Sequence, residues 1–352
     1  MSFNLLFILT FTVLSYTYLI WGFKNLQRED MQVAATIPVR KSIGSEQWEG
    51  INFIWYGVLI ANATAISIAL FFILTVGADI PVSASAIIIA AILAVSMPAS
   101  KIIARVVEKK SSTFTTGGAF FAGFLMTPVA IFIVNEIFGK YTNHTVPVMT
   151  VLAAMAITYA TGEGLGRLAC ISFGCCYGKP LNACSPFVQR IFSRFNFVFT
   201  GKTKKISYAH GWDGLKIIPV QGITSVINLS IACVGMFLYV NSHFTAAFLI
   251  ALILSQGWRI LSEFIRSDYR GDKKISWYQI MCAASILFAV IISCLTTEPA
   301  LVRIDTYAGI RVFTELTAVM FLQIVWICTA IYLGKSKVTA SRILLFVRAD
   351  KV

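Results

Sequence analysis

Two apolar stretches of the sequence carry charged side chains at helical spacing. In TGEGLGRLACISFGCCYGKP, Glu163 and Arg167 are four residues apart. In GWRILSEFIRSDYRGD, Arg259, Glu263 and Arg266 follow one another after four and then three residues, which places them on one face of a helix. Charged groups inside a membrane are costly and commonly functional. Two arginines from different helices at one depth predict a clamp for a lipid phosphate. The alternative is that each ion pair only neutralises itself and holds helices together.

Four cysteines follow the first charged stretch directly, at Cys170, Cys175, Cys176 and Cys184. Their spacing is too irregular for a standard zinc motif, and a disulfide is unfavourable if this segment faces a reducing cytoplasm. The pattern favours small packing residues in a tight, glycine-rich turn, with a metal site or a reactive thiol as the alternatives. We therefore predict no metal and no cofactor.

His210, in SYAHGWDG, is the only histidine of the long segment 174–217. An imidazole titrates near neutral pH, so His210 is a candidate general base; a solvated histidine without a role is the alternative. The neighbouring Lys202, Lys204 and Lys205 are expected to meet anionic lipid head groups. No nucleic-acid motif is visible in the sequence, so we expect no nucleic-acid partner.

The composition predicts that these motifs are carried by membrane-spanning helices. Of 352 residues, 57% are hydrophobic and 13% are charged, whereas soluble domains carry roughly 25% charged residues. A span needs roughly 20 apolar residues, and the first apolar run lacks the basic start and cleavage site of a signal peptide. We therefore predict an all-α, polytopic integral membrane protein of about nine transmembrane helices. The expected helices cover residues 4–22, 51–76, 81–100, 116–137, 147–166, 218–240, 244–265, 276–295 and 314–334.

Basic residues are divided very unevenly between the two membrane faces that these helices define. One face receives the segments after the first, third, fifth, seventh and ninth helices, and it carries 25 of the 29 lysines and arginines. The opposite face carries Lys140, Arg303 and Arg311. The positive-inside rule places the motif-bearing face in the cytoplasm and the N-terminus outside. Long segments count for less in this rule, but 17 basic residues against three remain when residues 167–217 are set aside.

The motifs resemble those of the prolipoprotein diacylglyceryl transferases. GRLACISFGCCYG is similar to the family's glycine–arginine box, GRIGNFINGExxG, and RILSEFIRSD is similar to its second box, RFxxEFxR. Three shorter matches occur in the family's order. WYG at Trp55–Gly57 resembles the start of its first helix, TTGGAFFAG around Gly117 and Gly118 resembles its HGGLxG turn, and PVQ at Pro219–Gln221 resembles its PSQLYE helix start.

The resemblance also implies a division of the chain. Residues 51–295 correspond to a seven-helix transferase core, within which residues 174–217 form an extramembrane loop domain. Residues 1–50 add an N-terminal helix and loop, and residues 296–352 add a C-terminal helix and a basic tail. A multi-pass enzyme of this family is expected in the bacterial cytoplasmic (inner) membrane.

The resemblance further implies a reaction. Members of the family move a diacylglyceryl group from phosphatidylglycerol to a cysteine thiol of a prolipoprotein and release glycerol phosphate. The leaving phosphate develops negative charge, which preorganised guanidinium groups stabilise. The implied roles are that Arg167 and Arg259 hold the phosphate, Glu263 orients Arg259, Arg266 lines the entrance and Tyr56 contacts the head group, while Gly117, Gly118, Gln221, Cys170 and Cys175 lie at the substrate site.

Three features depart from the family pattern. Thr116 stands where the family has a histidine before its double glycine. Cys170 and Cys175 replace the asparagine and the glutamate of the first box. The charge bias also places the motif face inside, whereas the family's motif face lies outside. Two alternatives therefore stand beside the prolipoprotein reaction: a small-molecule or glycan acceptor, or a non-catalytic lipid transporter. The expected partners are phosphatidylglycerol, a protein or small-molecule nucleophile, and membrane lipids.

Overall fold

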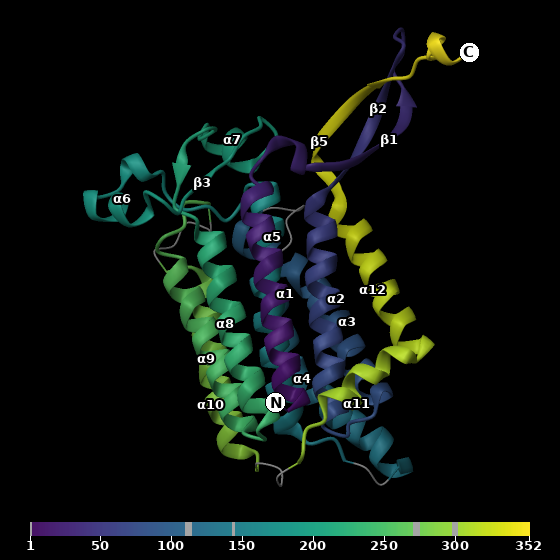
Figure 1. Ribbon diagram of the computed structural model, residues 1–352, viewed down its shortest axis with the longest axis vertical. Coiled ribbons are helices and arrows are strands. Elements are labelled where there is room, and N and C mark those ends of the chain that lie inside the picture. The colour runs from purple at the N-terminus through teal and green to yellow at the C-terminus, as the bar shows by residue number, and fades with distance from the viewer. Residues whose placement is uncertain (1, 110–114, 143–144, 270–274, 298–301) are drawn as a thin grey trace.

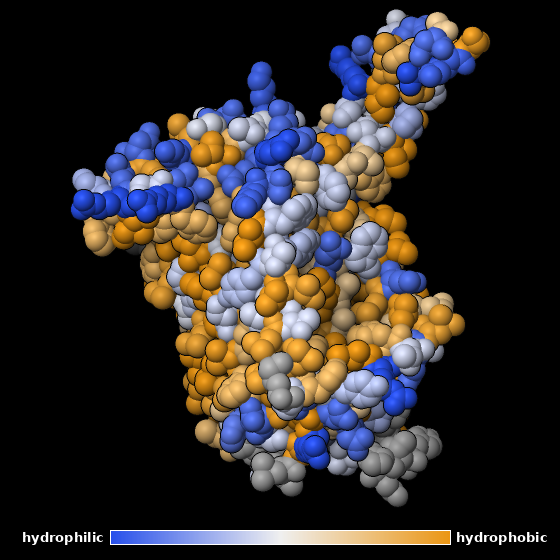
Figure 2. Space-filling view, in the orientation of Figure 1, coloured by the Kyte–Doolittle hydropathy of each residue, from blue (hydrophilic) through white to orange (hydrophobic). Residues whose placement is uncertain are grey.

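The computed structural model describes residues 2–109, 115–142, 145–269, 275–297 and 302–352, and it is mainly helical (Figure 1). Within these residues, nine helices are long and apolar enough to cross a membrane. They are α1 (Phe3–Asn25), α2 (Trp55–Gly77), α3 (Val82–Glu108), α4 (Thr116–Thr142), α5 (Val148–Phe173), α8 (Val220–Val240), α9 (Phe244–Ser262), α10 (Trp277–Leu295) and α12 (Leu316–Gly334). Each matches one expected helix, so the predicted all-α polytopic class is confirmed. Figure 2 shows apolar side chains around the middle of the molecule and hydrophilic ones gathered at both ends.

Helix α5 is the centre of the bundle. In its most apolar stretch 78% of residues are buried, against 17% for α1 and 6% for α12. Helices α2, α8 and α9 pack directly on it. Small residues permit this close approach: a Cβ added at Gly164 would lie 3.1 Å from the Ser225 carbonyl oxygen on α8. The helix that carries Glu163 and Arg167 is therefore enclosed on several sides.

Several helix ends differ from the sequence prediction: α3 continues to Glu108 instead of residue 100, α4 continues to Thr142 instead of residue 137, and α2 begins at Trp55 instead of residue 51. Two further differences lie at the charged motifs. Helix α5 continues through Phe173 instead of ending at residue 166, and it terminates at Gly174, whose φ of +70° suits glycine. Helix α9 ends at Ser262, and the amides of Ile265 and Arg266 both bond the Ser262 carbonyl in a following turn. Of the three residues expected on one helical face, Arg259 therefore lies within α9, Glu263 is its C-cap and Arg266 lies in the turn that follows.

The two terminal additions form a sheet that the sequence did not predict. Strands β1 (Val33–Lys41), β2 (Gln47–Ile54) and β5 (Lys335–Leu344) are antiparallel in the order β1-β2-β5, and they extend from one end of the bundle (Figure 1). The C-terminal tail thus pairs with the segment that follows α1. Below the sheet, α12 packs on α2, where a Cβ added at Gly57 would lie only 2.3 Å from Gly334 Cα. The two glycines let these helices touch.

The segment 174–217 is ordered and lies at the same end of the bundle as the sheet (Figure 1). Its elements are η2 (Leu181–Ala183), α6 (Pro186–Phe192), β3 (Phe197–Val198), α7 (Lys205–His210) and β4 (Lys216–Ile217). The short helices elsewhere in the chain are η1 (Glu29–Met31), α11 (Thr306–Arg311), η3 (Val312–Thr314) and η4 (Ala349–Lys351). Strands β3 and β4 pair with each other. Of the basic residues assigned to this face, Lys110, Arg270, Lys273 and Lys274 lie outside the described residues.

Lys204 does not meet lipid head groups, which corrects the sequence prediction. Its side chain is fully buried, and its Nζ donates to the carbonyl oxygens of Leu26 at 3.2 Å and Ser172 at 2.7 Å. Burial lowers the pKa of Lys204 to about 8, against the opposing effect of nearby acidic groups. These carbonyls end α1 and α5, where the helix dipole favours a cation. Lys204 therefore ties the N-terminal addition to the central helix.

The sidedness predicted from the basic residues can be tested at two exposed positions. Lys202 lies in the segment 174–217, and Arg303 lies at the opposite end, beside Ile304, whose carbonyl accepts from Asn4. In a background whose native cysteines do not label, Lys202→Cys should resist a membrane-impermeant maleimide in intact cells and react after permeabilisation. Arg303→Cys should react in intact cells, because the positive-inside rule places that end outside. The reverse pattern would place the charged motifs outside.

Candidate functional site

A single carboxylate joins the arginines of the two motifs. Glu163 accepts from Arg167, one turn later on α5, and from Arg259 Nη1 on α9 at 3.1 Å. All three side chains are at least 90% buried. The expected Glu163–Arg167 pair is present, and the two arginines from different helices are brought together as the sequence predicted. They share one counter-ion instead of having one each.

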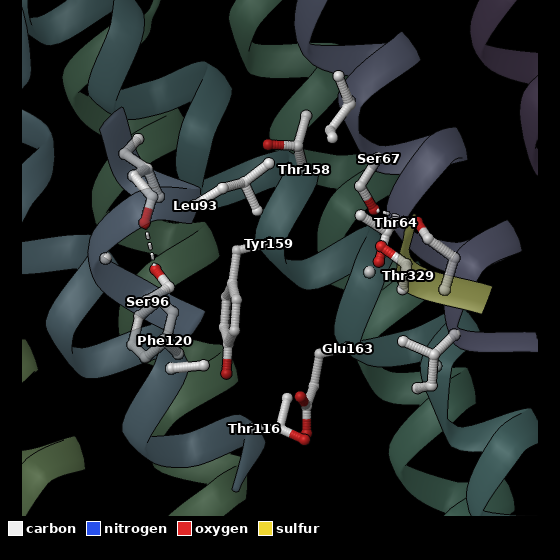
Figure 3. Close-up of a pocket in the computed structure, with 18 of the residues that line it drawn as sticks. Thr64, Ser67, Leu93, Ser96, Thr116, Phe120, Thr158, Tyr159, Glu163 and Thr329 are labelled. Carbon is white, nitrogen blue, oxygen red and sulfur yellow. Dashed lines mark hydrogen bonds between the residues drawn. The ribbon is translucent and has the colours of Figure 1, made fainter. Parts of the chain in front are cut away.

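Tyr159 is a member of this group that the sequence analysis missed. Its hydroxyl lies 3.4 Å from Arg259 Nη1, and its ring centroid is 3.8 Å from that of Phe120 on α4. Tyr159, Glu163 and Arg167 are spaced by four residues, so they share one face of α5. Figure 3 shows Tyr159 pointing along the cavity wall toward Glu163. The spacing is present in the sequence, but a tyrosine in an apolar helix carries no charge that would mark it as functional.

Glu263 and Arg266 form a separate ion-paired group. Arg266 Nε and Nη2 donate to the two carboxylate oxygens of Asp268, each at 2.9 Å, and its Nη1 lies 3.5 Å from Glu263. Glu263 was expected to orient Arg259; the carboxylate that accepts from Arg259 is Glu163, and Glu263 is paired with Arg266. The fork-shaped pair with Asp268 fixes the turn after α9.

A cavity of about 260 Å³ begins at Glu163 and Arg167 and continues between the helices. Its two charged lining residues lie at one end, with Tyr56, Thr116 and Cys170, while single hydroxyl groups such as those of Ser67, Ser96 and Thr158 are spread along the rest. The rest of the lining is mostly apolar and comes from α2, α3, α4 and α5, with smaller contributions from α9 and α12, as in Ile68, Ile89, Ile92, Leu93, Met97, Phe120, Phe124, Met155, Leu252 and Leu333. Figure 3 shows Glu163 and Thr116 at one end of it and Leu93 toward the other.

Three of the other predicted site residues lie around the charged end of this cavity. Tyr56 lines it, with its ring centroid 5.7 Å from that of Phe173. Gly117 is in the first turn of α4, where an added Cβ would lie 2.7 Å from Arg259 Nη2. Gly118 faces α3 instead, and its added Cβ would lie 2.9 Å from Ile103. The double glycine therefore lets α4 approach both α3 and the Arg259 guanidinium.

Gln221 and His210 do not line the cavity formed by the described residues. Gln221 Nε2 donates to the Cys175 carbonyl oxygen at 2.7 Å, so it holds the turn after α5. His210 is exposed at the end of α7, and its Nδ1 lies 2.6 Å from the Tyr177 hydroxyl oxygen. Burial raises the pKa of Tyr177, so this hydroxyl keeps its proton near neutral pH.

The structure brings Cys170, Cys175 and Cys176 together. Their sulfur atoms all lie within 4.8 Å of one another, and Cys184 is not part of this group. The chain reverses at Gly174, so residues five and six positions after Cys170 return to the end of its helix. The sequence analysis placed these cysteines in one tight turn, but their irregular spacing did not show that three of the four sulfurs meet and that Cys184 does not.

Comparison with known protein families gives a match over most of the chain. The sequence model of the family described as prolipoprotein diacylglyceryl transferase matches residues 46–295. The chain belongs to this family. It is therefore a membrane-embedded transferase of the diacylglyceryl transferase type, and the predicted family membership is confirmed. The match runs from β2 to the end of α10, and α1 and α12 lie outside it. A comparison with curated proteins gives no match.

Replacement of Glu163 should destabilise the protein more than replacement of an exposed glutamate. Glu163→Gln leaves two buried guanidinium groups without their shared counter-ion, which typically costs about 3–5 kcal/mol. Unfolding by dodecyl sulfate in mixed micelles, followed by circular dichroism, measures this loss. The matched control is Glu315→Gln, whose side chain is exposed. A loss equal to that of the control would show that the arginines are held by other contacts.

Proposed function

We propose that this transferase takes a diacylglyceryl group from phosphatidylglycerol and attaches it to a cysteine thiol of an acceptor protein, releasing glycerol phosphate. The expected setting is the bacterial cytoplasmic membrane. The observation that carries the proposal is one buried carboxylate shared by two arginines, where Glu163 and Arg167 line the charged end of a cavity whose remaining lining is mostly apolar. Such a cavity suits a molecule with an anionic head and hydrocarbon chains.

The charge of the arginine group fits a phosphodiester. Glu163, Arg167 and Arg259 together carry one net positive charge, and phosphatidylglycerol carries one negative charge at its phosphate. Among the described residues, the Nε atoms of Arg167 and Arg259 are buried without a hydrogen-bond partner. Buried donors of this kind are rare in folded proteins and call for a partner. A phosphate oxygen would supply that partner and use the planar geometry of guanidinium groups.

The length of the cavity fits an acyl chain. From Arg167, which would hold the phosphate, its lining on α5 extends to Met155, about 18 Å away at the rise of an α-helix. Half of a bilayer's hydrocarbon core is about 15 Å thick. A lipid with its phosphate at Arg167 would therefore direct its chains along the apolar wall toward the membrane centre.

In this arrangement the arginines stabilise the leaving group. The thiolate of the acceptor attacks the glyceryl carbon, the carbon–oxygen bond breaks, and the electron pair remains on the phosphate oxygen. Guanidinium groups fixed in a dry site stabilise that charge without reorganising. Tyr56 would contact the head group, and Gly117 would leave the space that the Arg259 guanidinium occupies. His210 remains a prediction for the general base. It lies on α7 and is not among the residues that line the cavity.

Arg167→Ala and Arg259→Ala should each abolish transfer. Loss of one preorganised donor typically reduces turnover by about 100- to 1,000-fold, and lysine should not restore it because it lacks the planar fork. The measurement is release of glycerol phosphate from phosphatidylglycerol by purified variants in the presence of a cysteine peptide.

Normal chromatographic behaviour of the arginine variants shows that they fold. Full turnover by either alanine variant would overturn the phosphate-clamp assignment. If the unmodified protein moved labelled lipid between leaflets but released no glycerol phosphate, it would be a transporter.

Gly117→Ala provides a finer test of the same site. The new methyl group would displace the Arg259 guanidinium, and a misplacement near 1 Å can cost about 100-fold in rate. The matched control is Gly257→Ala on α9, two residues before Arg259, where an added Cβ meets nothing within 4 Å. We expect the control to keep its turnover and to gain stability, since alanine in a helix is favoured by about 1 kcal/mol over glycine. Equal turnover in both variants would contradict the placement of Arg259.

A further inference from the structure

The cysteine group, defined as Cys170, Cys175 and Cys176, has the dimensions of a thiolate metal site. The sulfurs of Cys175 and Cys176 are 3.8 Å apart, and all three lie within 4.8 Å. Zinc binds cysteine sulfur at about 2.3 Å, which separates the sulfurs of a tetrahedral site by about 3.8 Å. One sulfur pair therefore already has the required separation, and the third sulfur needs to move by about 1 Å at most.

The backbone holds these sulfurs together without help from a disulfide. Gly174 and Cys176 have φ values of +70° and +60°, so the chain folds back on the end of α5. A positive φ is uncommon for cysteine and persists where the surroundings enforce it. The Cys175 amide bonds the Cys170 carbonyl at 3.0 Å, and Gln221 Nε2 holds the Cys175 carbonyl at 2.7 Å. The turn is fixed by contacts that leave the three thiols directed at one another.

The cysteine group adjoins the cavity and positive charge. Cys170 lines the cavity three residues after Arg167 on α5. On the other side, Gly178 forms a β-bridge with Arg266, and the Ser267 amide bonds the Tyr177 carbonyl. Three thiolates around a divalent cation would carry one net negative charge, close to the guanidinium groups of Arg167 and Arg266, which are themselves paired with carboxylates. A fourth coordination position next to Cys170 would open toward the cavity, as in catalytic zinc sites with three protein ligands.

The cavity otherwise lacks a group to deprotonate an acceptor. Its titratable lining residues are Tyr56, Tyr159, Glu163, Arg167 and Cys170. Glu163 is occupied by two arginines, and among the described lining residues there is no histidine or lysine. A thiol bound to a metal ion loses its proton outright. A metal beside the cavity would therefore supply the function that the lining does not.

We propose that Cys170, Cys175 and Cys176 bind a Zn²⁺ ion whose fourth position takes the acceptor's thiol. Thiolate ligands and tetrahedral geometry favour zinc over magnesium or calcium. The part of this inference that concerns the acceptor rests on the proposed transfer to a cysteine thiol, and the metal site stands on the sulfur geometry alone.

The transfer step balances without a redox partner. The acceptor thiol releases its proton to water as its sulfur enters the fourth position. The thiolate sulfur attacks the glyceryl carbon and forms a carbon–sulfur bond, while the carbon–oxygen bond to phosphate breaks. Glycerol phosphate leaves with the electron pair on its oxygen. The thioether product is a weaker ligand than a thiolate, so water displaces it and the three cysteines keep their metal.

Metal content tests the site without any lipid turnover. The full chain, purified in detergent at buffered free Zn²⁺, should hold close to one zinc ion. Cys176→Ser, at a half-buried position, should lower the zinc content by about tenfold or more at the same free zinc. The matched control, Cys184→Ser, replaces a half-buried cysteine of the same segment that lies outside the group. Zinc content that is equal in the two variants, or a disulfide within the group in acid-trapped protein, would overturn the site.

The fourth position is tested with Co²⁺ as a spectroscopic probe. Co²⁺ in the unmodified chain should give sulfur-to-metal charge-transfer bands that Cys176→Ser loses. Addition of N-acetylcysteine amide should shift these bands, and N-acetylserine amide should not. If the charge-transfer bands do not change when N-acetylcysteine amide is added, the metal is purely structural and the proposal that its fourth position binds the acceptor thiol is overturned. An inactive protein that passes both tests would instead count against the proposed function.

Discussion

The site depends on one carboxylate held between two guanidinium groups inside the membrane. Glu163 neutralises Arg167 on its own helix and Arg259 on α9. Without these contacts each charge would cost several kcal/mol in a low-dielectric interior. The three side chains together keep one net positive charge. Enclosure of α5 by other helices keeps water away from this charge while it remains available to a ligand in the cavity. This requirement explains why the most buried stretch in the bundle belongs to α5, and why glycines let α4 and α8 approach the charged side chains.

The additions outside the family match contribute to the site through the same central helices. Helix α12 touches α2 at Gly57 and supplies Thr329 and Leu333 to the cavity wall. At the other terminus, α1 is tied to the end of α5 by Lys204, whose single ammonium group satisfies carbonyls of both helices. The cysteine turn lies directly after that helix end. The N-terminal addition therefore stabilises the place where the chain reverses.

Hydropathy was sufficient to predict the nine spans, because a helix in lipid must satisfy its backbone internally and be apolar over its length. The charged residues were found for the same reason, since they interrupt such runs. The Glu163–Arg167 pair was predicted as well, but the contact between Glu163 and Arg259 was not, because these residues are 96 positions apart and no local pattern links them. The sheet was missed likewise: β2 pairs with a strand nearly 300 residues away, and strand pairing over that distance leaves no periodic signal. Lys204 was misjudged because lysine is rarely buried.

The order of residues on α5 has a consequence for the chemistry. Arg167 and Cys170 are separated by three residues, or about 4.5 Å along the helix axis. A phosphate held by Arg167 has its glyceryl carbon one oxygen away, and a thiol beside Cys170 would lie within a few ångströms of that carbon. Donor and acceptor would then be positioned by one rigid helix instead of by two mobile loops. Orientation of this kind can replace much of the effect of a general base, because it removes the entropic cost of bringing the two reactants together.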